Sequence, residues 1–416
     1  MVRSSSLETA QLSQIFFGRL LESISALLGP ELITRFEELK RQRERFLREQ
    51  WSGGDSEESD PIFREVDYEY LVTAIRRQET ISLEAQADVQ IELAKICYQF
   101  GELQKSIDLL THVRQHTLDD QSSQQGVVYE LLGKVETHRN NWDRARHWLT
   151  QALHLYEEAQ NIEGMVSAHM HLGILTAQRW NIPSALDHLE QGRSLMNQGS
   201  VDDSLEFKID SNRAIIEGML GKSKEAADRF QQLLDQEFGK HPQYSIQLQI
   251  NLGTAIKEQG DLAAAEPILE EALDAAQALP HTRLIAQGAA ALAEVRILQG
   301  KHDTGQRHLI TAFKIFSQLH DRASLADIYR TFGILHRETG YPDLAAAKFD
   351  ISLEMNREYG NLLNLLDTHY DYSLLAGKEN EPEKQKYHLE KALAYAEKMG
   401  AIPRIEKLRK ELNSLK

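Results

Sequence analysis

Proline, cysteine and long apolar runs are all scarce in this 416-residue sequence. With only nine prolines, the chain consists of long stretches of Ala, Leu, Glu, Gln, Lys and Arg, and strand-like runs of Val, Ile and Thr are missing. Those abundant residues are strong helix formers, so the sequence predicts an all-α fold. At 41% hydrophobic and 26% charged residues, the chain can fold but is too long for one ordinary compact core.

The low content of cysteine, apolar runs and positive charge limits the compartments and partners that this protein is expected to have. A single cysteine, Cys97, excludes an internal disulfide framework and fits a reducing compartment. Residues 1–8 show no signal-peptide hydrophobic region, and no apolar run approaches the ~20 residues that a membrane helix needs. The net charge of −16 repels a phosphate backbone. We therefore expect a soluble cytoplasmic protein with neither a nucleic-acid nor a membrane partner.

Patterns typical of active sites are missing as well. No Gly-rich phosphate loop, Gly-x-Ser-x-Gly motif or Cys-x-x-Cys pair occurs. His112 and His116 are four residues apart and could share a helix face, but no third metal ligand is evident. His188, His308 and His388 recur at matched positions, which favours a structural role. The sequence predicts no catalytic residue, no metal site and no cofactor, and hence a protein that is not an enzyme.

What the sequence does contain is an internal repeat of about forty residues, marked by a residue suited to end a helix. Gly and Asn tolerate the left-handed backbone conformation found at helix ends. They recur at gaps of 39, 81, 39, 40, 40 and 40 residues, and Trp180-Asn181 fills the double gap. The positions are Gly101, Asn140, Gly221, Gly260, Gly300, Gly340 and Asn380. Each is expected to be the turn of a helix hairpin.

Small and large residues alternate in step with these turns. Seven residues before each turn comes a small or polar residue, which we call the anchor: Ala94, Gly133, Gly173, Ala214, Gly253, Ala293, Gly333 and Ser373. Nine residues after each turn comes a large apolar residue: Leu110, Leu149, Leu189, Phe230, Leu269, Leu309, Phe349 and Leu389. The small residues let the two helices of a hairpin approach closely, and the large ones fill the space beside them.

This spacing resembles the tetratricopeptide repeat, as in Leu252-Gly253 followed by Ala265, Leu269 and Ala272. The resemblance implies a right-handed α-solenoid of eight helix hairpins. The period is forty rather than thirty-four residues, as in kinesin light chain and in Rap-type bacterial regulators, and the extra residues are expected to lengthen both helices. The family's Trp in the first helix is absent, and its usual Tyr is replaced, for example by Glu136 and His336.

The repeats are expected to span residues 81–400, with a segment of another kind at each end. Residues 1–80 read as an N-terminal helical cap or bundle with an acidic loop at 52–60. They could cap the first repeat, form a homodimer interface or act as an effector module. Residues 401–416 place Ile402, Ile405, Leu408, Leu412 and Leu415 at helical spacing, which predicts a C-terminal capping helix.

In proteins of this type, ligands usually lie along the concave face, which the first helices of the hairpins line. The residues flanking the anchors there form a groove with an apolar middle and cations on either side, suited to an extended peptide with carboxylates. Asn212 and Asn251 stand where related repeats place an Asn that bonds a peptide backbone; bonds to neighbouring helices are an equal alternative. The predicted peptide-binding residues are Lys95, Tyr98, Lys134, His138, Asn212, Ile215, Ile250, Asn251, Thr254, Lys257, Arg330 and Arg337.

Two functions remain open from the sequence. The first is a non-catalytic adaptor or scaffold that captures a peptide or a helical segment of a partner protein in the groove. The second is a Rap-type signalling regulator, in which peptide binding to the repeats controls N-terminal helices that act on a response regulator. The sequence contains no motif matching a phosphatase glutamine, so this second analogy concerns architecture.

Overall fold

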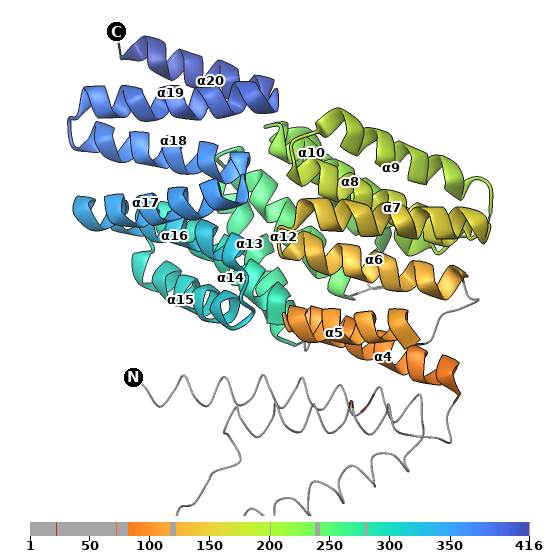
Figure 1. The fold of residues 1–416 in the computed structure, drawn as a ribbon. Coiled ribbons are helices and arrows are strands. Elements are labelled where there is room, and N and C mark those ends of the chain that lie inside the picture. Colours follow the sequence, from red (N-terminus) through yellow and green to blue (C-terminus); the bar gives the residue numbers. More distant parts are fainter. Residues whose placement is uncertain are drawn as a thin grey trace, which may run out of the picture. The chain divides into compact units, whose positions relative to one another are not determined.

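The computed structural model describes residues 82–415, apart from 117–121, 200, 238–241 and 279–281, together with Glu22 and Val72. This part of the chain is all helix, as predicted, with no strand (Figure 1). The helices are α4 (Leu83–Gln99), α5 (Leu103–His116), α6 (Ser122–His138), α7 (Trp142–Glu158), α8 (Ile162–Gln178), α9 (Ile182–Met196), α10 (Asp203–Met219), α11 (Ser223–Glu237), α12 (Pro242–Glu258), α13 (Leu262–Gln277), α14 (Thr282–Leu298), α15 (His302–Gln318), α16 (Arg322–Glu338), α17 (Pro342–Tyr359), α18 (Leu362–Lys378), α19 (Pro382–Met399) and α20 (Ile402–Ser414).

The helices form successive hairpins, and the predicted turn positions are confirmed. All seven Gly and Asn turn residues have positive φ angles, between 56° for Asn380 and 88° for Gly260. In the hairpin of α8 and α9, Trp180 takes this place, with a φ of 60°. From α4 to α18, the first helix of every hairpin has 17 residues. Positions forty residues apart therefore recur at the same level of neighbouring first helices.

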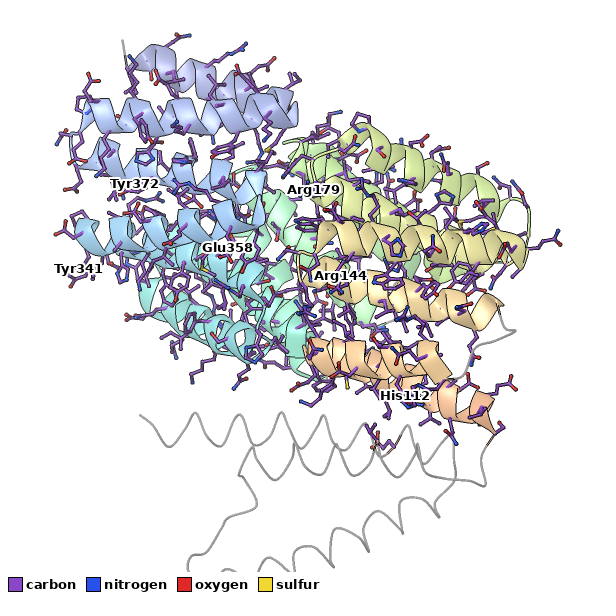
Figure 2. The ribbon with its side chains drawn as sticks, viewed as in Figure 1. His112, Arg144, Arg179, Tyr341, Glu358 and Tyr372 are labelled. Atoms are coloured by element: carbon purple, nitrogen blue, oxygen red, sulfur yellow. The ribbon has the colours of Figure 1, made fainter. Side chains whose placement is uncertain are left out.

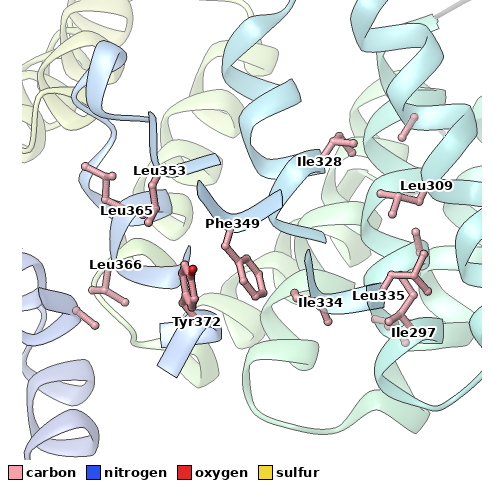
Figure 3. Packing of buried hydrophobic residues seen from close by; sticks show 14 of the residues in the cluster. Ile297, Leu309, Ile328, Ile334, Leu335, Phe349, Leu353, Leu365, Leu366 and Tyr372 are labelled. Atoms are coloured by element: carbon pink, nitrogen blue, oxygen red, sulfur yellow. The ribbon is translucent and has the colours of Figure 1, made fainter. Parts of the chain in front are cut away.

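The anchors act by close contact, as the spacing predicted. A Cβ atom added to Gly253 would lie 2.6 Å from Leu269 Cγ, and one added to Gly173 would lie 3.0 Å from a Leu189 methyl carbon. One added to Gly333 would overlap the ring of Phe349, which is fully buried and packs against Tyr372 (Figure 3). The small residue of the first helix thus makes room for the large residue of the second.

The chain divides into two compact units, residues 1–135 and 136–416, and each is described by itself. In the second unit, one apolar cluster extends without interruption from α13 to α20, and Ile405 and Leu408 of α20 belong to it. Two of the apolar residues at helical spacing in residues 401–416 thus pack into this cluster. The predicted N-terminal cap and its loop at 52–60 lie outside the described residues. No described helix combines the length and apolarity of a membrane span.

Two of the histidines at matched positions, His188 and His388, each pair with another histidine. His169 pairs with His188 through the two Nδ1 atoms at 3.2 Å, and His369 pairs with His388 at 2.9 Å, two hundred residues further on. The guanidinium of Arg179, which Figure 2 labels, lies 5.9 Å from the centre of the Trp142 ring. Among the described residues, no group of three or more His, Cys, Asp or Glu side chains could hold a metal ion.

The close contact at the anchor predicts opposite effects for two glycine substitutions. Gly333→Ala should lower the free energy of unfolding by about 1–3 kcal/mol, because the Phe349 ring has to move within a filled core. Gly218→Ala adds a Cβ that meets only Ala226 Cβ, at an ordinary 3.7 Å, so helix propensity should leave stability equal or raised by up to ~1 kcal/mol. Urea titrations followed by circular dichroism measure both; equal effects would contradict the assigned packing.

Candidate functional site

The second unit contains a cavity of about 480 Å³ at the first helices of its central hairpins. Helices α10, α12, α14, α16 and α18 all contribute to its wall, and α20 adds one side chain, Arg404. One part of the wall is apolar, including Ile215, Phe230 and Ile250, and another part is ionic. The ionic lining residues are Lys257, Glu258, Glu294, Asp327, Arg330, Asp367 and Arg404.

Small residues on α14 contribute to the opening of this space. Ala290 and Ala291 line the cavity, whereas the residues forty positions earlier, on α12, are the larger Ile250 and Asn251. Forty positions later, on α16, Arg330 replaces the alanine. Because these positions lie at one level of adjacent helices, the alanines leave a recess between two bulkier neighbours.

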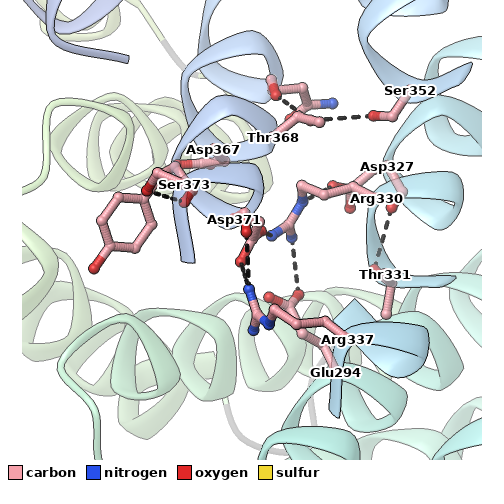
Figure 4. A network of polar contacts seen from close by, with 12 residues as sticks. Glu294, Asp327, Arg330, Thr331, Arg337, Ser352, Asp367, Thr368, Asp371 and Ser373 are labelled. Atoms are coloured by element: carbon pink, nitrogen blue, oxygen red, sulfur yellow. Dashed lines mark hydrogen bonds and ion pairs between the residues drawn. The ribbon is translucent and has the colours of Figure 1, made fainter. Parts of the chain in front are cut away.

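The ionic part of the wall belongs to a network that crosses α12, α14, α16, α18 and α20. Figure 4 shows the part of it around Glu294, Arg330 and Asp371. Glu294 accepts from both Lys257 Nζ, at 2.9 Å, and Arg330, at 3.1 Å, and Arg330 also donates to Asp371 at 2.7 Å. These side chains are buried. Successive ion pairs connect Asp367, Arg404, Glu258, Lys257, Glu294, Arg330, Asp371, Arg337, Glu338 and Lys378.

The network fixes the charge of its buried members. Burial alone would raise the pKa of Glu294, but Arg330 and Lys257 outweigh it and lower that pKa to about 2. Burial alone would lower the pKa of Lys257, but Glu294 and Glu258 raise it above its usual value. Asp367 behaves differently: burial raises its pKa, Arg404 opposes this, and Glu258 adds to it. Of Glu258, Glu294 and Asp367, only Asp367 has a raised pKa, so its charge is the least well compensated of these three.

Two amide side chains in the same wall have buried atoms that form no hydrogen bond with any described residue. Gln247 donates to Asn251 Oδ1 at 3.2 Å, and this leaves the donor Nδ2 of Asn251 without an acceptor. On the next first helix, the acceptor Oε1 of Gln287 has no donor. Buried polar atoms are rarely left unpaired, since each costs about 1–3 kcal/mol. Both residues line the cavity, while the two atoms themselves are buried, so a ligand would meet them once these side chains turn towards the cavity.

Six of the twelve predicted groove residues line this cavity: Ile215, Ile250, Asn251, Thr254, Lys257 and Arg330. Arg337 does not line the cavity; it is buried and forms ion pairs with Asp371 and Glu338. Lys257, Arg330 and Arg337, which were expected to meet ligand carboxylates, are thus all paired with carboxylates of the chain itself.

The remaining five predicted residues lie elsewhere. Asn212 donates to Lys208 O, 2.8 Å away within its own helix, and does not line the cavity. Lys95, Tyr98 and Lys134 belong to the first unit, where Lys134 Nζ lies 5.7 Å from the centre of the Tyr98 ring. His138 is exposed at the end of α6.

Sequence reasoning missed Gln287, Asp327, Asp367 and Arg404. The first three lie forty residues apart, each six residues before an anchor, so extending the inspected positions by one helical turn would have found them. Arg404 lies outside the repeats, and no periodicity points to it.

No protein-family model and no curated protein matches the sequence. Among solved structures, the Rap conjugation gene regulator of the plasmid pLS20, in complex with a Phr peptide, aligns with a TM-score of 0.56 and 12% identity over 95% of this chain and 96% of the regulator. The apo form of the quorum sensor NprR from B. thuringiensis aligns with a TM-score of 0.50 and 14% identity, over 81% and 97% of the two chains. The chain has the fold of tetratricopeptide-repeat proteins.

Glu294 is predicted to stabilise the second unit through its two buried cations. Glu294→Gln should lower the free energy of unfolding by about 3 kcal/mol, the low end for breaking a buried pair, because both cations keep other carboxylate partners. The folded-state pKa of about 2 lies below the ordinary 4.5, so this contribution is complete above pH 4.5 and disappears as the pH falls towards 2. Denaturant titrations between pH 2 and 7 measure both effects.

Glu358 provides the matched control. It pairs with Arg322 at 3.2 Å, but both side chains are more than half exposed, so Glu358→Gln should change stability by about 0–1 kcal/mol at any of these pH values (Figure 2). If the two variants lost equal stability, the network around Glu294 would not be the stabilising feature described.

Proposed function

We propose that this protein is a non-catalytic adaptor that binds an extended peptide segment of a partner in the cavity lined by α10, α12, α14, α16 and α18. The observation that carries the proposal is the cavity, whose wall holds the amide side chains of Asn251 and Gln287, with Nδ2 and Oε1 bonded to no described residue. A peptide group offers a carbonyl to the first and an N–H to the second. The apolar wall around Ile215, Phe230 and Ile250 provides a surface on which side chains of the peptide can be buried.

The comparisons add support of a limited kind. The regulator encoded on pLS20 was solved with a peptide bound, and NprR is described as a quorum sensor. Both share this fold across most of their length. A fold by itself does not carry a function, so the proposal rests on the cavity, and the relatives make a peptide a more natural occupant than another amide-bearing molecule.

Binding of pooled synthetic peptides to the full-length chain tests the proposal. Pools of random hexapeptides are equilibrated with the protein, and the enriched sequences are recovered by gel filtration, identified by mass spectrometry and titrated by calorimetry. Asn251→Ala and Gln287→Ala should each weaken binding about two- to tenfold, as expected for one net hydrogen bond. Gln287→Ala should leave the melting temperature nearly unchanged, because Oε1 has no partner among the described residues. Asn251→Ala also removes the acceptor of the Gln247 bond and should cost about 1 kcal/mol, so its affinity is compared at a temperature where the variant is folded.

Asn212→Ala is the control, since that side chain bonds its own helix and lies off the cavity. It should leave peptide affinity unchanged. If no peptide is enriched, or if all three variants bind as the wild type does, the cavity is not a peptide site.

A second candidate is a signalling regulator in which the bound peptide acts through the N-terminal residues. The favouring observation is the alignment with the pLS20 regulator, which covers 95% of this chain and 96% of the regulator. Removing residues 1–80 distinguishes the two. An adaptor would keep both its peptide and its partner, whereas a regulator would keep its peptide and lose its effect on the partner.

A further inference from the structure

Arg404 is the one residue of α20 in the cavity wall, and it comes from outside the repeats. Its Nη1 donates to Asp367 Oδ1 of α18 at 2.5 Å, and its Nη2 lies 3.7 Å from Glu258 Oε2 of α12. Its side chain also covers the turn between α10 and α11, where a Cβ on Gly221 would lie 2.9 Å from Arg404 Cγ. Arg404 thus joins the C-terminal helix to three hairpins around the cavity.

The contacts of Arg404 are incomplete for a guanidinium held in a protein interior. The Nε atom is buried and has no acceptor among the described residues, and the contact with Glu258 is too long for a hydrogen bond. Arg404 is also the third residue of α20, at the end where the helix dipole disfavours a positive charge. The bond to Asp367 is therefore its main attachment.

Three of the four carboxylates in the lining are more exposed than any of its cations, while Glu294 is as buried as Lys257 and Arg330. Lys257 and Arg330 are each 9% exposed, whereas Glu258 is 38%, Asp327 41% and Asp367 24% exposed. The lining has three cations, Lys257, Arg330 and Arg404, against the four carboxylates of Glu258, Glu294, Asp327 and Asp367, a net charge of −1. Without Arg404 the balance would be two against four, or −2.

Two of the exposed carboxylates stand at matched positions of neighbouring helices. Gln287, Asp327 and Asp367 stand forty residues apart on α14, α16 and α18, so they form a row along one level of the cavity. Asn251 and Gln287, with their unpaired atoms, lie at the α12 and α14 side of the same wall. A peptide whose backbone is bonded there extends towards the carboxylates as it passes α16 and α18.

We propose that the cavity binds a peptide bearing a guanidinium or ammonium side chain, and that this cation replaces Arg404 on Asp367 and Glu258 and releases the start of α20. The proposal rests on the peptide-binding function proposed above and specifies the charge of the ligand. It makes Arg404 an internal occupant of the cation position in the ligand-free protein. When the ligand enters, its cation forms ion pairs with Asp367 and Glu258, the ion pairs of Arg404 with these carboxylates break, and the start of α20 is released.

Three peptide pools that differ at one residue test this proposal on the full-length chain. Each pool consists of N-acetylated, C-amidated hexapeptides with random apolar and polar residues and one fixed residue, which is arginine, its uncharged analogue citrulline, or glutamate. The arginine pool should bind at least tenfold more tightly than the citrulline pool, and the glutamate pool more weakly than either. Hydrogen exchange of the α20 amides from Ile405 onward, the first N–H that bonds four residues back, should accelerate with the arginine pool only.

Two variants test the competition directly. Arg404→Gln removes the internal competitor and should raise the affinity for the arginine pool at least threefold, whereas Asp367→Asn should reduce it at least tenfold. Arg409→Gln is the control, because Arg409 lies on the same helix but is exposed and pairs with Glu397 of α19. Melting curves establish that each variant is folded, and the exchange measurement on the wild-type chain needs no variant.

The possible results separate this inference from the proposed function. Equal binding of the arginine and citrulline pools, or unchanged exchange in α20, overturns the exchange of ion pairs and leaves peptide binding intact. A failure of all pools to bind overturns both. A lower affinity of Arg404→Gln for the arginine pool would show that Arg404 helps to hold the ligand, which also contradicts the proposal.

Discussion

The contact between a small anchor in one helix and a large apolar residue in the next is the constraint on which this structure depends. Gly253 against Leu269 and Gly333 against Phe349 set how closely the helices of a hairpin approach. With a constant period and first helices of constant length, this contact also sets their register. Residues forty positions apart therefore become neighbours, and the cavity wall, the ion-pair network and the row from Gln287 to Asp367 all follow from that register.

The same constraint explains why the fold could be predicted from the sequence. Turn conformation and close packing are local properties, so Gly340 or Gly333 can be recognised by residue type and spacing alone. Trp180 shows the limit of residue type, because it adopts a left-handed conformation that its side chain disfavours, and the surrounding register places it there. Repetition supplied the information that this single residue did not.

The candidate site could be predicted only in part, for a physical reason. The repeat period indicates which residues face the groove, and the residues it indicated include Ile215, Asn251 and Lys257, which line the cavity. Whether a cation is available to a ligand depends on pairs across helices, such as Lys257 with Glu294, which no single helix reveals. Arg404 reaches the cavity because the chain brings α20 back to the level of α12, a long-range contact that lies outside any repeat.

Polar groups in this wall fall into two kinds, and the difference is informative. Glu294 and Arg330 are buried with good partners, an arrangement that fixes the relative positions of the helices but adds little net stability over apolar packing. Asn251 Nδ2, Gln287 Oε1 and Arg404 Nε are buried without partners. Other described atoms, such as Trp180 Nε1 and Asn356 Oδ1, are also buried without a hydrogen-bond partner, but their residues do not line this cavity. What distinguishes Asn251, Gln287 and Arg404 is their shared place in one cavity wall, where a ligand can offer partners once their side chains turn towards it.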